Sequence, residues 1–179
     1  SMLDSAGVLA IVLPEVQQRR AEHFHEALIA SRVKLDSAVV DSVYQAGELR
    51  LIRHILLRTE PAMAPPARAA KLREAEAIRA RLRAGGSWAE ANRKSQDPRA
   101  QPNGGSVGVV ARGDLMAPVE KVAFGLEPGG LSDIVESPLG YHVVNRPRLK
   151  DTRAEFTVGV EDRMVDQLDS AYLGSLPAR

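Results

Sequence analysis

The chain has 179 residues, of which 44% are hydrophobic, and this size and composition suit one globular domain with flanking segments. Its 24 basic and 23 acidic residues nearly cancel, which excludes a general positive field that would attract nucleic acid or an anionic membrane. Cysteine is absent, so disulfides, thiolate catalysis and cysteine-ligated metals are excluded as well. Recognition of any partner must therefore be local.

The first 47 residues are expected to form a helical segment. Pro14 opens the stretch 14–33, whose apolar residues share one helical stripe, and Gly47 ends a second helix over residues 37–46. The longest apolar run, AGVLAIVLP, is about half the length that a membrane span needs. The opening pair Ser-Met is typical of a remnant of a cloning vector, so we expect a native signal or anchor to have preceded it. Two such helices bury too little surface to stand alone, so we expect them to dock on the next domain or on a part of the protein beyond this sequence.

After Gly47 the hydrophobic period becomes that of a β-strand. In ELRLIRHILLR, residues 48–58, alternation places Ile52, His54 and Leu56 on one face of the strand. Two helices are expected next, over 67–84 and 88–95, and the second has Ser87 as its N-cap. The later elements expected are a strand over 106–112, a helix over 117–126, strands over 131–137 and 141–148, and a helix over 154–173.

Four separated blocks of the chain carry a family resemblance: RHILL at 53–57, SQD at 95–97, NGGSVGVVARGDL at 103–115 and APVEKVAFGLEPGGLSDIVESPLGYHVV at 117–144. Together they resemble the parvulin family of peptidyl-prolyl cis/trans isomerases, over about residues 50–148. The resemblance implies an α+β fold, in which helices surround a four-stranded antiparallel sheet and further helices flank it at both ends. It divides the chain into an N-terminal helical segment (1–47), an isomerase domain (48–150) and a C-terminal helical segment (151–179). The two flanks resemble those of extracytoplasmic chaperone-isomerases of the SurA and PrsA kind, in which they build a chaperone module.

The resemblance also implies a set of site residues. The family's two central histidines fall on His54 and His142, its catalytic aspartate or cysteine falls on Asp97, and its hydroxyl residue before the last hairpin turn falls on Ser137. The implied substrate-binding residues, which would receive the proline ring, are Val107, Val110, Leu115, Val119, Phe124 and Leu139. Aromatic residues are usual in the family where this chain has Val110, Val119 and Leu139, so we expect catalysis to be weaker than is usual and binding to outlast it.

The implied function is isomerisation of X-Pro bonds in unfolded or exported proteins, as a folding helper. Neither a cofactor nor a metal is implied, and the expected partners are proline-containing polypeptides, with no nucleic acid and no membrane insertion of this chain. The resemblance places the protein in the periplasm or cell envelope, with the cytoplasm as the alternative. Phosphate selectivity is not expected, because the loop after the first strand offers only Arg58 and Arg68 with Glu60 between them.

Three other functions stay open at this stage. A parvulin domain that grips proline-containing segments without turning them over would be a chaperone or binding module. Two histidines and an aspartate brought together by folding could instead hold iron or zinc, although no compact ligand motif is present. A Ser-His-Asp hydrolase is the weakest alternative, since no serine lies in a G-x-S-x-G turn. The glycine-rich NGGSVG lacks the lysine of a phosphate-binding loop and indicates a turn.

Overall fold

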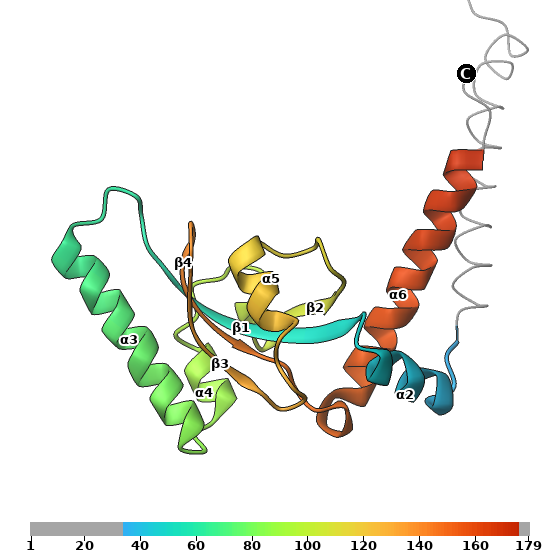
Figure 1. Ribbon diagram of the computed structural model, residues 1–179, viewed down its shortest axis with the longest axis horizontal. Coiled ribbons are helices and arrows are strands. Elements are labelled where there is room, and N and C mark those ends of the chain that lie inside the picture. The colour runs from blue at the N-terminus through green and yellow to red at the C-terminus, as the bar shows by residue number, and fades with distance from the viewer. Residues whose placement is uncertain (1–33, 176–179) are drawn as a thin grey trace, which may run out of the picture. The chain divides into compact units, whose positions relative to one another are not determined.

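The computed structural model describes the backbone of residues 34–175 (Figure 1). The helix expected over 14–33 lies outside the described residues. The elements are α2 (Ser37–Ala46), β1 (Arg50–Arg58), α3 (Pro65–Arg83), α4 (Trp88–Asn92), the 3₁₀ turn η1 (Gln101–Asn103), β2 (Ser106–Val110), α5 (Ala117–Ala123), β3 (Leu131–Ser137), β4 (Gly140–Asn145) and α6 (Leu149–Ser175). No helix of this described part is long and apolar enough to cross a membrane.

The four strands form one antiparallel sheet in the order β2-β1-β4-β3. Along the central pair, Leu56 of β1 lies opposite His142 of β4, and His54 lies opposite Val144. Residues two apart on a strand share a face, so His54 and His142 project from the same face of the sheet as diagonal neighbours. The predicted α+β architecture with an antiparallel four-stranded sheet is confirmed.

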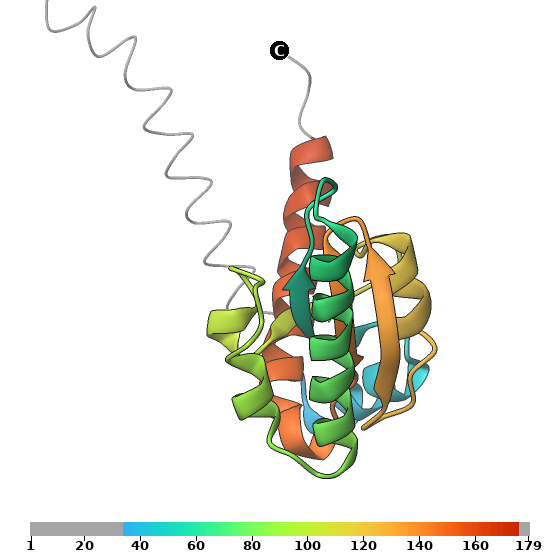
Figure 2. The same ribbon diagram turned by 90° about the vertical axis from the view of Figure 1, so that its left-hand side faces the viewer.

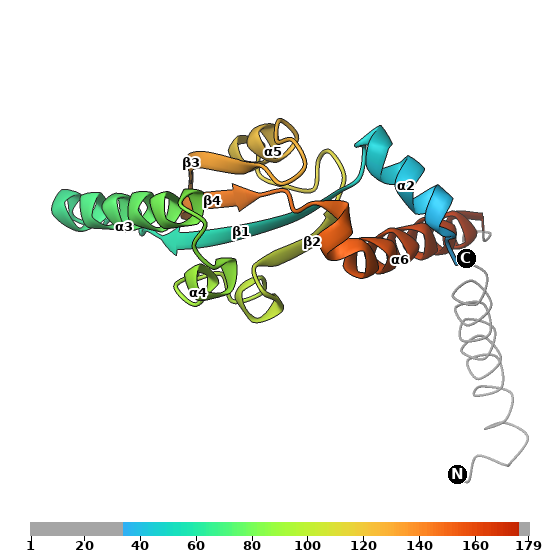
Figure 3. The same cartoon turned by 90° about the horizontal axis from the view of Figure 1, so that it is seen from below.

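Each face of the sheet has its own apolar core, as the alternation along β1 predicted. Helix α3 covers the face that carries Ile55, and Figure 2 shows this helix in front of the sheet. Helix α5 packs on the face that carries Ile52, and in Figure 3 α5 and α4 lie on opposite sides of the strands. The buried residues on the α3 face are Ile55, Leu57, Ala75, Ile78, Tyr141 and Val143. Those on the α5 face are Ile52, Val110, Val119, Ala123, Phe124, Val135 and Val144.

Helix α2 and the first part of α6 belong to the same compact unit as the sheet, Ser37–Val160. The Tyr44 ring of α2 lies edge-on to Phe156 of α6, 5.4 Å between centroids, and its hydroxyl donates to the carbonyl of Pro147 (3.2 Å). Of the two outcomes that we expected for this helix, the structure shows docking on the following domain. The unit includes more residues than the range 48–150. The functional division of the chain at residues 47 and 150 stays a prediction.

Gly159 explains how α6 approaches the sheet. Gly159 lies within α6, although glycine has low helix propensity. A Cβ at this position would lie 2.5 Å from Cγ2 of Val109 on β2, so any larger residue would push the helix away. The glycine therefore allows close contact between α6 and the edge strand.

Candidate functional site

The edge of β1 determines where Asp97 lies. Strand β2 pairs with β1 only as far as Arg53, and the segment after α4 takes over the remaining edge. The Leu56 N–H donates to Ser95 Oγ (3.1 Å), and the Gln96 N–H donates to the Leu56 carbonyl (2.7 Å). These bonds hold the next residue, Asp97, beside the side chain of His54.

A continuous chain of hydrogen bonds joins the four predicted catalytic residues. Asp97 Oδ2 lies 2.9 Å from His54 Nε2, the Nδ1 atoms of His54 and His142 lie 3.2 Å apart, and His142 Nε2 lies 2.7 Å from Ser137 Oγ. The Leu139 N–H donates to Ser137 Oγ (3.1 Å) and closes this end of the chain. Side chains from β1, β3, β4 and the loop after α4 are therefore linked into one polar network.

The two ends of the network fix the direction of its protons. An ionised Asp97 only accepts, so His54 carries its proton on Nε2 and presents the lone pair of Nδ1. His142 must then donate from Nδ1 and accept at Nε2 from the Ser137 hydroxyl. Both imidazoles are neutral in this arrangement, each with a defined tautomer. All hydrogen bonds point toward the carboxylate, so they polarise one another and stabilise its charge.

Burial and neighbouring groups keep the network in this protonation state. Burial lowers the pKa of His54, against the opposing effect of Asp97. Burial and the neighbouring His54 lower the pKa of His142 to about 4. Burial raises the pKa of Asp97, but hydrogen bonds from the Ala100 and Arg99 N–H groups and the contact with His54 outweigh it, so that pKa lies below its usual value. At neutral pH the aspartate is charged and the histidines are not.

The histidine pair should make the protein sensitive to mild acid. In the unfolded chain a histidine takes up a proton near pH 6.5, whereas folded His142 resists protonation down to about pH 4. The contribution of the neutral His142 to the free energy of unfolding is therefore fully present above pH 6.5. It is lost as the pH falls from 6.5 toward 4, by about 3 kcal/mol in all. The depressed pKa of Asp97 acts only at lower pH. Urea unfolding at pH 7.0 and 4.5 should show this loss, and a His142→Leu variant should show a smaller one; equal losses would contradict the buried neutral pair.

The six predicted substrate-binding residues divide by exposure. Val110, Val119 and Phe124 are buried in the core between α5 and the sheet, where they are 4%, 5% and 8% exposed. Val107 and Leu115 are half-buried and pack against that core, so they offer its accessible apolar surface. Leu139, in the hairpin turn between β3 and β4, is 39% exposed and apart from this group. The structure brings five of the six into one apolar cluster, and their role in binding stays a prediction.

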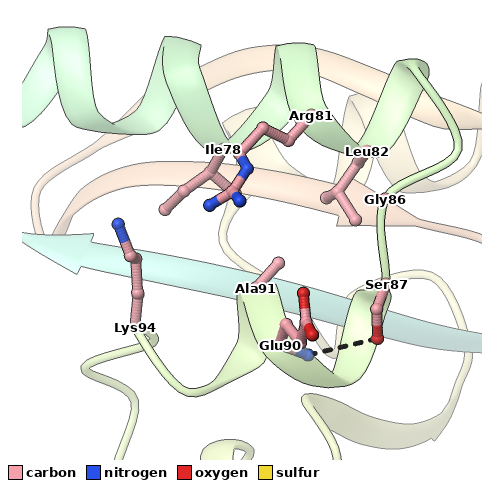
Figure 4. A pocket seen from close by; sticks show the side chains of 8 residues that line it. All are labelled: Ile78, Arg81, Leu82, Gly86, Ser87, Glu90, Ala91 and Lys94. Carbon is pink, nitrogen blue, oxygen red and sulfur yellow. Dashed lines mark hydrogen bonds between the residues drawn. The ribbon is translucent and has the colours of Figure 1, made fainter.

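Two cavities in the unit lie elsewhere. One, of about 80 Å³, lies between α3 and α4 and has Ile78, Leu82 and Ala91 as its apolar floor, with Arg81 and Lys94 at the sides (Figure 4). The other, of about 570 Å³, is lined by Arg53, Leu82, Gly85, Trp88, Gly129, Asn145, Pro147, Arg148, Asp151 and Thr152. None of the predicted site residues lines either cavity.

The open metal-site alternative gains nothing from the geometry. Among residues 34–175, no group of three or more histidine, aspartate or glutamate side chains is arranged to hold a metal ion. The two Nδ1 atoms of the histidine pair face each other, and each Nε2 atom has a protein partner. The hydroxyl of Ser137 is likewise engaged and is 94% buried with the rest of its residue, which disfavours a nucleophilic serine.

Sequence reasoning missed two residues that bind the backbone of β1 next to the network. Ser95 holds the edge of β1, and Gly105 accepts the His54 N–H at its carbonyl (2.8 Å). Gly105 has a φ of 83°, and a Cβ there would lie 2.9 Å from the His54 carbonyl and from Asn92 Oδ1. The glycine pair in NGG indicated a turn, and that signal could have marked a close approach to the strand that carries His54.

Comparisons with known proteins identify the family of the chain. The family model of the PpiC-type PPIase domain, or rotamase, matches residues 54–147, just over half of the chain. The chain belongs to this family. The match begins at His54 and contains every predicted site residue.

Two curated relatives illustrate how much of the chain is shared by this family. Foldase protein PrsA of Halalkalibacterium halodurans is 36% identical over 92 residues, which cover 51% of this chain and 28% of that protein. Chaperone SurA of Cupriavidus pinatubonensis is 36% identical over 145 residues, which cover 79% of this chain and 28% of that protein. The chain thus spans little more than a quarter of the length of either relative.

A solved structure supports the fold of the PpiC-type domain. The crystal structure of PrsA from Bacillus subtilis superposes with a TM-score of 0.51 at 21% identity, covering 84% of this chain and 56% of that one. At this identity the likeness concerns the fold alone.

Proposed function

We propose that this PpiC-type domain is a peptidyl-prolyl cis/trans isomerase acting on X-Pro bonds of polypeptide clients. The observation that carries the proposal is the hydrogen-bonded chain from Asp97 through His54 and His142 to Ser137, on the sheet face whose core also packs against the half-buried Val107 and Leu115. This combination offers a charged group and an apolar surface for a proline ring on one face of the sheet.

Isomerisation needs no bond to be made or broken, only a lower barrier for rotation about an amide. That barrier is about 20 kcal/mol and arises from amide resonance. An apolar surface that holds the proline ring excludes water from the amide, which favours the twisted geometry in which resonance is lost. Binding of the rest of the peptide outside this surface then contributes most at the transition state.

Asp97 is the member of the network that can reach a substrate. Its side chain is 19% exposed, whereas the side chain of His54 is 8% exposed. We propose that the Asp97 carboxylate acts electrostatically on the substrate carbonyl, whose electron demand changes as the amide twists. His54 and His142 act as positioning residues, which fix the carboxylate and hold its charge state.

The proposal is tested by measuring isomerisation directly. NMR exchange spectroscopy on a short Ala-Pro peptide should show faster cis/trans exchange at micromolar protein, and a protease-coupled assay should give the same order of rate. A heat-denatured sample of the same concentration is the control. Peptide binding without any acceleration would overturn the enzyme assignment.

That outcome would favour the second candidate, a binding module within a chaperone. The observation behind it is the set of aliphatic residues where the family usually has aromatic ones: Val110 and Val119 are buried, and Leu139 is exposed. A proline ring held by such residues gains less than it would against aromatic walls. The names of the SurA and PrsA relatives, a chaperone and a foldase, support unfolded polypeptides as clients. We propose as well that the clients are exported proteins and that the protein acts outside the cytoplasm, as the family resemblance of the chain implied.

A further inference from the structure

The segment that carries Asp97 connects α4 to β2 and contains no regular element except the short turn η1. Beyond Asp97 this segment folds back on itself. Asp97 Oδ1 accepts the N–H groups of Arg99 and Ala100, at 2.8 Å each, and the Asp97 carbonyl accepts the Gln101 N–H (3.0 Å). The contacts that hold this folded part therefore determine where the carboxylate lies.

Asn92, the last residue of α4, holds the segment on both sides of Asp97. Its side chain is buried with the rest of the residue, which is 6% exposed, and Nδ2 donates to the carbonyl of Gln101 (2.8 Å). Its own carbonyl accepts the N–H of Ser95 (2.9 Å). One residue of the helix thus binds the chain just before the aspartate and again just after it.

The same side chain lies against the residue that supports His54. A Cβ on Gly105 would lie 2.9 Å from Asn92 Oδ1, and the carbonyl of Gly105 accepts the His54 N–H (2.8 Å). The amide of Asn92 is therefore next to both backbones whose side chains meet in the 2.9 Å contact between Asp97 Oδ2 and His54 Nε2.

Packing alone does not account for an amide at this position. Among residues 34–175, Asn92 Oδ1 is buried and has no hydrogen-bond partner, which is unfavourable. Alanine is the best helix former and would end α4 without an unpaired oxygen. What asparagine adds is the bond from Nδ2 to Gln101, which no apolar side chain can make.

We infer that Asn92 is a positioning residue for isomerisation, because its amide holds the segment that places Asp97 beside His54. The inference rests on the proposed function, since it gives Asn92 a part in the reaction through the carboxylate. Asn92 makes no contact with the substrate in this role, so its whole effect on the rate passes through Asp97.

The Asn92→Ala variant tests this role by separating kcat from binding. We expect kcat on an Ala-Pro peptide to fall about tenfold, because a displacement of about 1 Å in a catalytic group can cost about 100-fold. The dissociation constant from NMR titration should change by less than about twofold, since the apolar surface of Val107 and Leu115 keeps its residues. Exchange spectroscopy over a series of peptide concentrations gives kcat and KM.

Two further variants serve as control and as reserve. Asn103→Ala is the matched control, because Asn103 lies in the same segment and its Nδ2 also binds a carbonyl, that of Arg99 (3.1 Å), but the residue is exposed. Its kcat should stay within about twofold of wild type. Asn92→Leu keeps the branched shape of the side chain and removes its donor, so it should show the same loss as Asn92→Ala without a cavity.

A double-mutant cycle separates positioning from a general structural role. In the Asp97→Asn background the charge that Asn92 positions is gone, so Asn92→Ala should lower kcat further by less than about twofold. A residue that merely stabilises the fold would lower kcat by the same factor in both backgrounds.

The titration of Asp97 gives a readout that needs no activity. Burial raises the pKa of Asp97, and the N–H groups of Arg99 and Ala100 together with His54 lower it by more. Asn92→Ala should loosen those contacts and raise this pKa toward the ordinary value, as followed by the ¹³C shift of the carboxyl carbon. Asn103→Ala should leave it unchanged.

The outcomes distinguish this inference from the proposed function. Full activity in Asn92→Ala, equal losses in both backgrounds, or an unchanged pKa of Asp97 would overturn the inference alone. Loss of fold in both Asn92→Ala and Asn92→Leu, seen by urea unfolding, would make Asn92 a residue of the core and would also overturn it. If wild type does not isomerise the peptide, the proposed function fails. The pKa of Asp97 then still tests the placement of the carboxylate, with a rise in Asn92→Ala supporting it.

Discussion

The Asp97→Asn variant should lose about 100-fold in kcat/KM on an X-Pro peptide, which is the effect usual for removing one preorganised electrostatic group. The substitution keeps the size of the side chain, and its Oδ1 can still accept the N–H groups of Arg99 and Ala100. What is lost is the negative charge and the acceptor at Oδ2 that receives His54 Nε2–H. An amide N–H placed there would force His54 to change tautomer and would reverse the proton direction through the network.

This prediction is checked with two measurements on the same variant. NMR exchange spectroscopy gives the isomerisation rate, and the ¹⁵N chemical shifts of the imidazoles of His54 and His142 report their tautomers. Wild type should show His54 protonated at Nε2 and His142 at Nδ1, and the variant should show the opposite pair. Full activity in Asp97→Asn would mean that the carboxylate charge plays no part in catalysis.

The same contacts bear on the simpler variant Asp97→Ala. Asp97 accepts two backbone N–H groups as well as His54, so its removal leaves three donors without their partner. We expect Asp97→Ala to cost about 1–2 kcal/mol in the free energy of unfolding. Asp97→Asn is for this reason the cleaner test of chemistry.

Much of the fold could be predicted because the local signals agree with the packing. The alternation in β1 placed Ile52 and Ile55 on opposite faces, and each is completely buried in its own core. Ser87 was expected to cap α4, and its Oγ accepts the Glu90 N–H. Helix α3 begins at Pro65, two residues earlier than predicted, because proline fits the first turn of a helix.

The candidate site could be predicted only through the family motifs. Nothing in the local pattern shows that His54, His142 and Asp97 meet, because 88 residues separate the histidines and the contact depends on the β1–β4 register. The arrangement of their hydrogen bonds depends on where the loop after α4 docks on β1. Ser95 belongs to the SQD motif, but its local sequence pattern does not show that docking. Long-range pairing of this kind leaves no trace in local periodicity.

The apolar cluster shows a second limit of sequence reasoning. Valine, leucine and phenylalanine at these positions are expected in a core whether or not a substrate binds there. The structure separates the half-buried Val107 and Leu115 from the buried Val110, Val119 and Phe124, a distinction that residue type cannot make. The accessible pair is accordingly the better target for mutations meant to weaken binding without unfolding the protein.

The His54→Ala variant should lose about 3 kcal/mol or more in the free energy of unfolding, because several costs act together. Its side chain is in the sheet core, where the residue is 7% exposed, and its removal leaves a cavity. His142 is only 1% exposed, and its Nδ1–H loses its acceptor. Asp97 Oδ2 loses its donor. An unpaired buried polar group costs about 1–3 kcal/mol by itself.

Urea unfolding at pH 7 measures this loss, with Leu139→Ala as the control, since Leu139 is exposed and should change stability by less than about 0.5 kcal/mol. A double-mutant cycle of His54→Ala with His142→Ala isolates the contact between the two rings, whose coupling should be about 1–3 kcal/mol. Because each single variant leaves the other histidine unpaired, removing both should cost less than the sum of the two. Additive losses would show that the imidazoles stabilise the sheet separately, and that the short Nδ1–Nδ1 distance reflects proximity without a hydrogen bond.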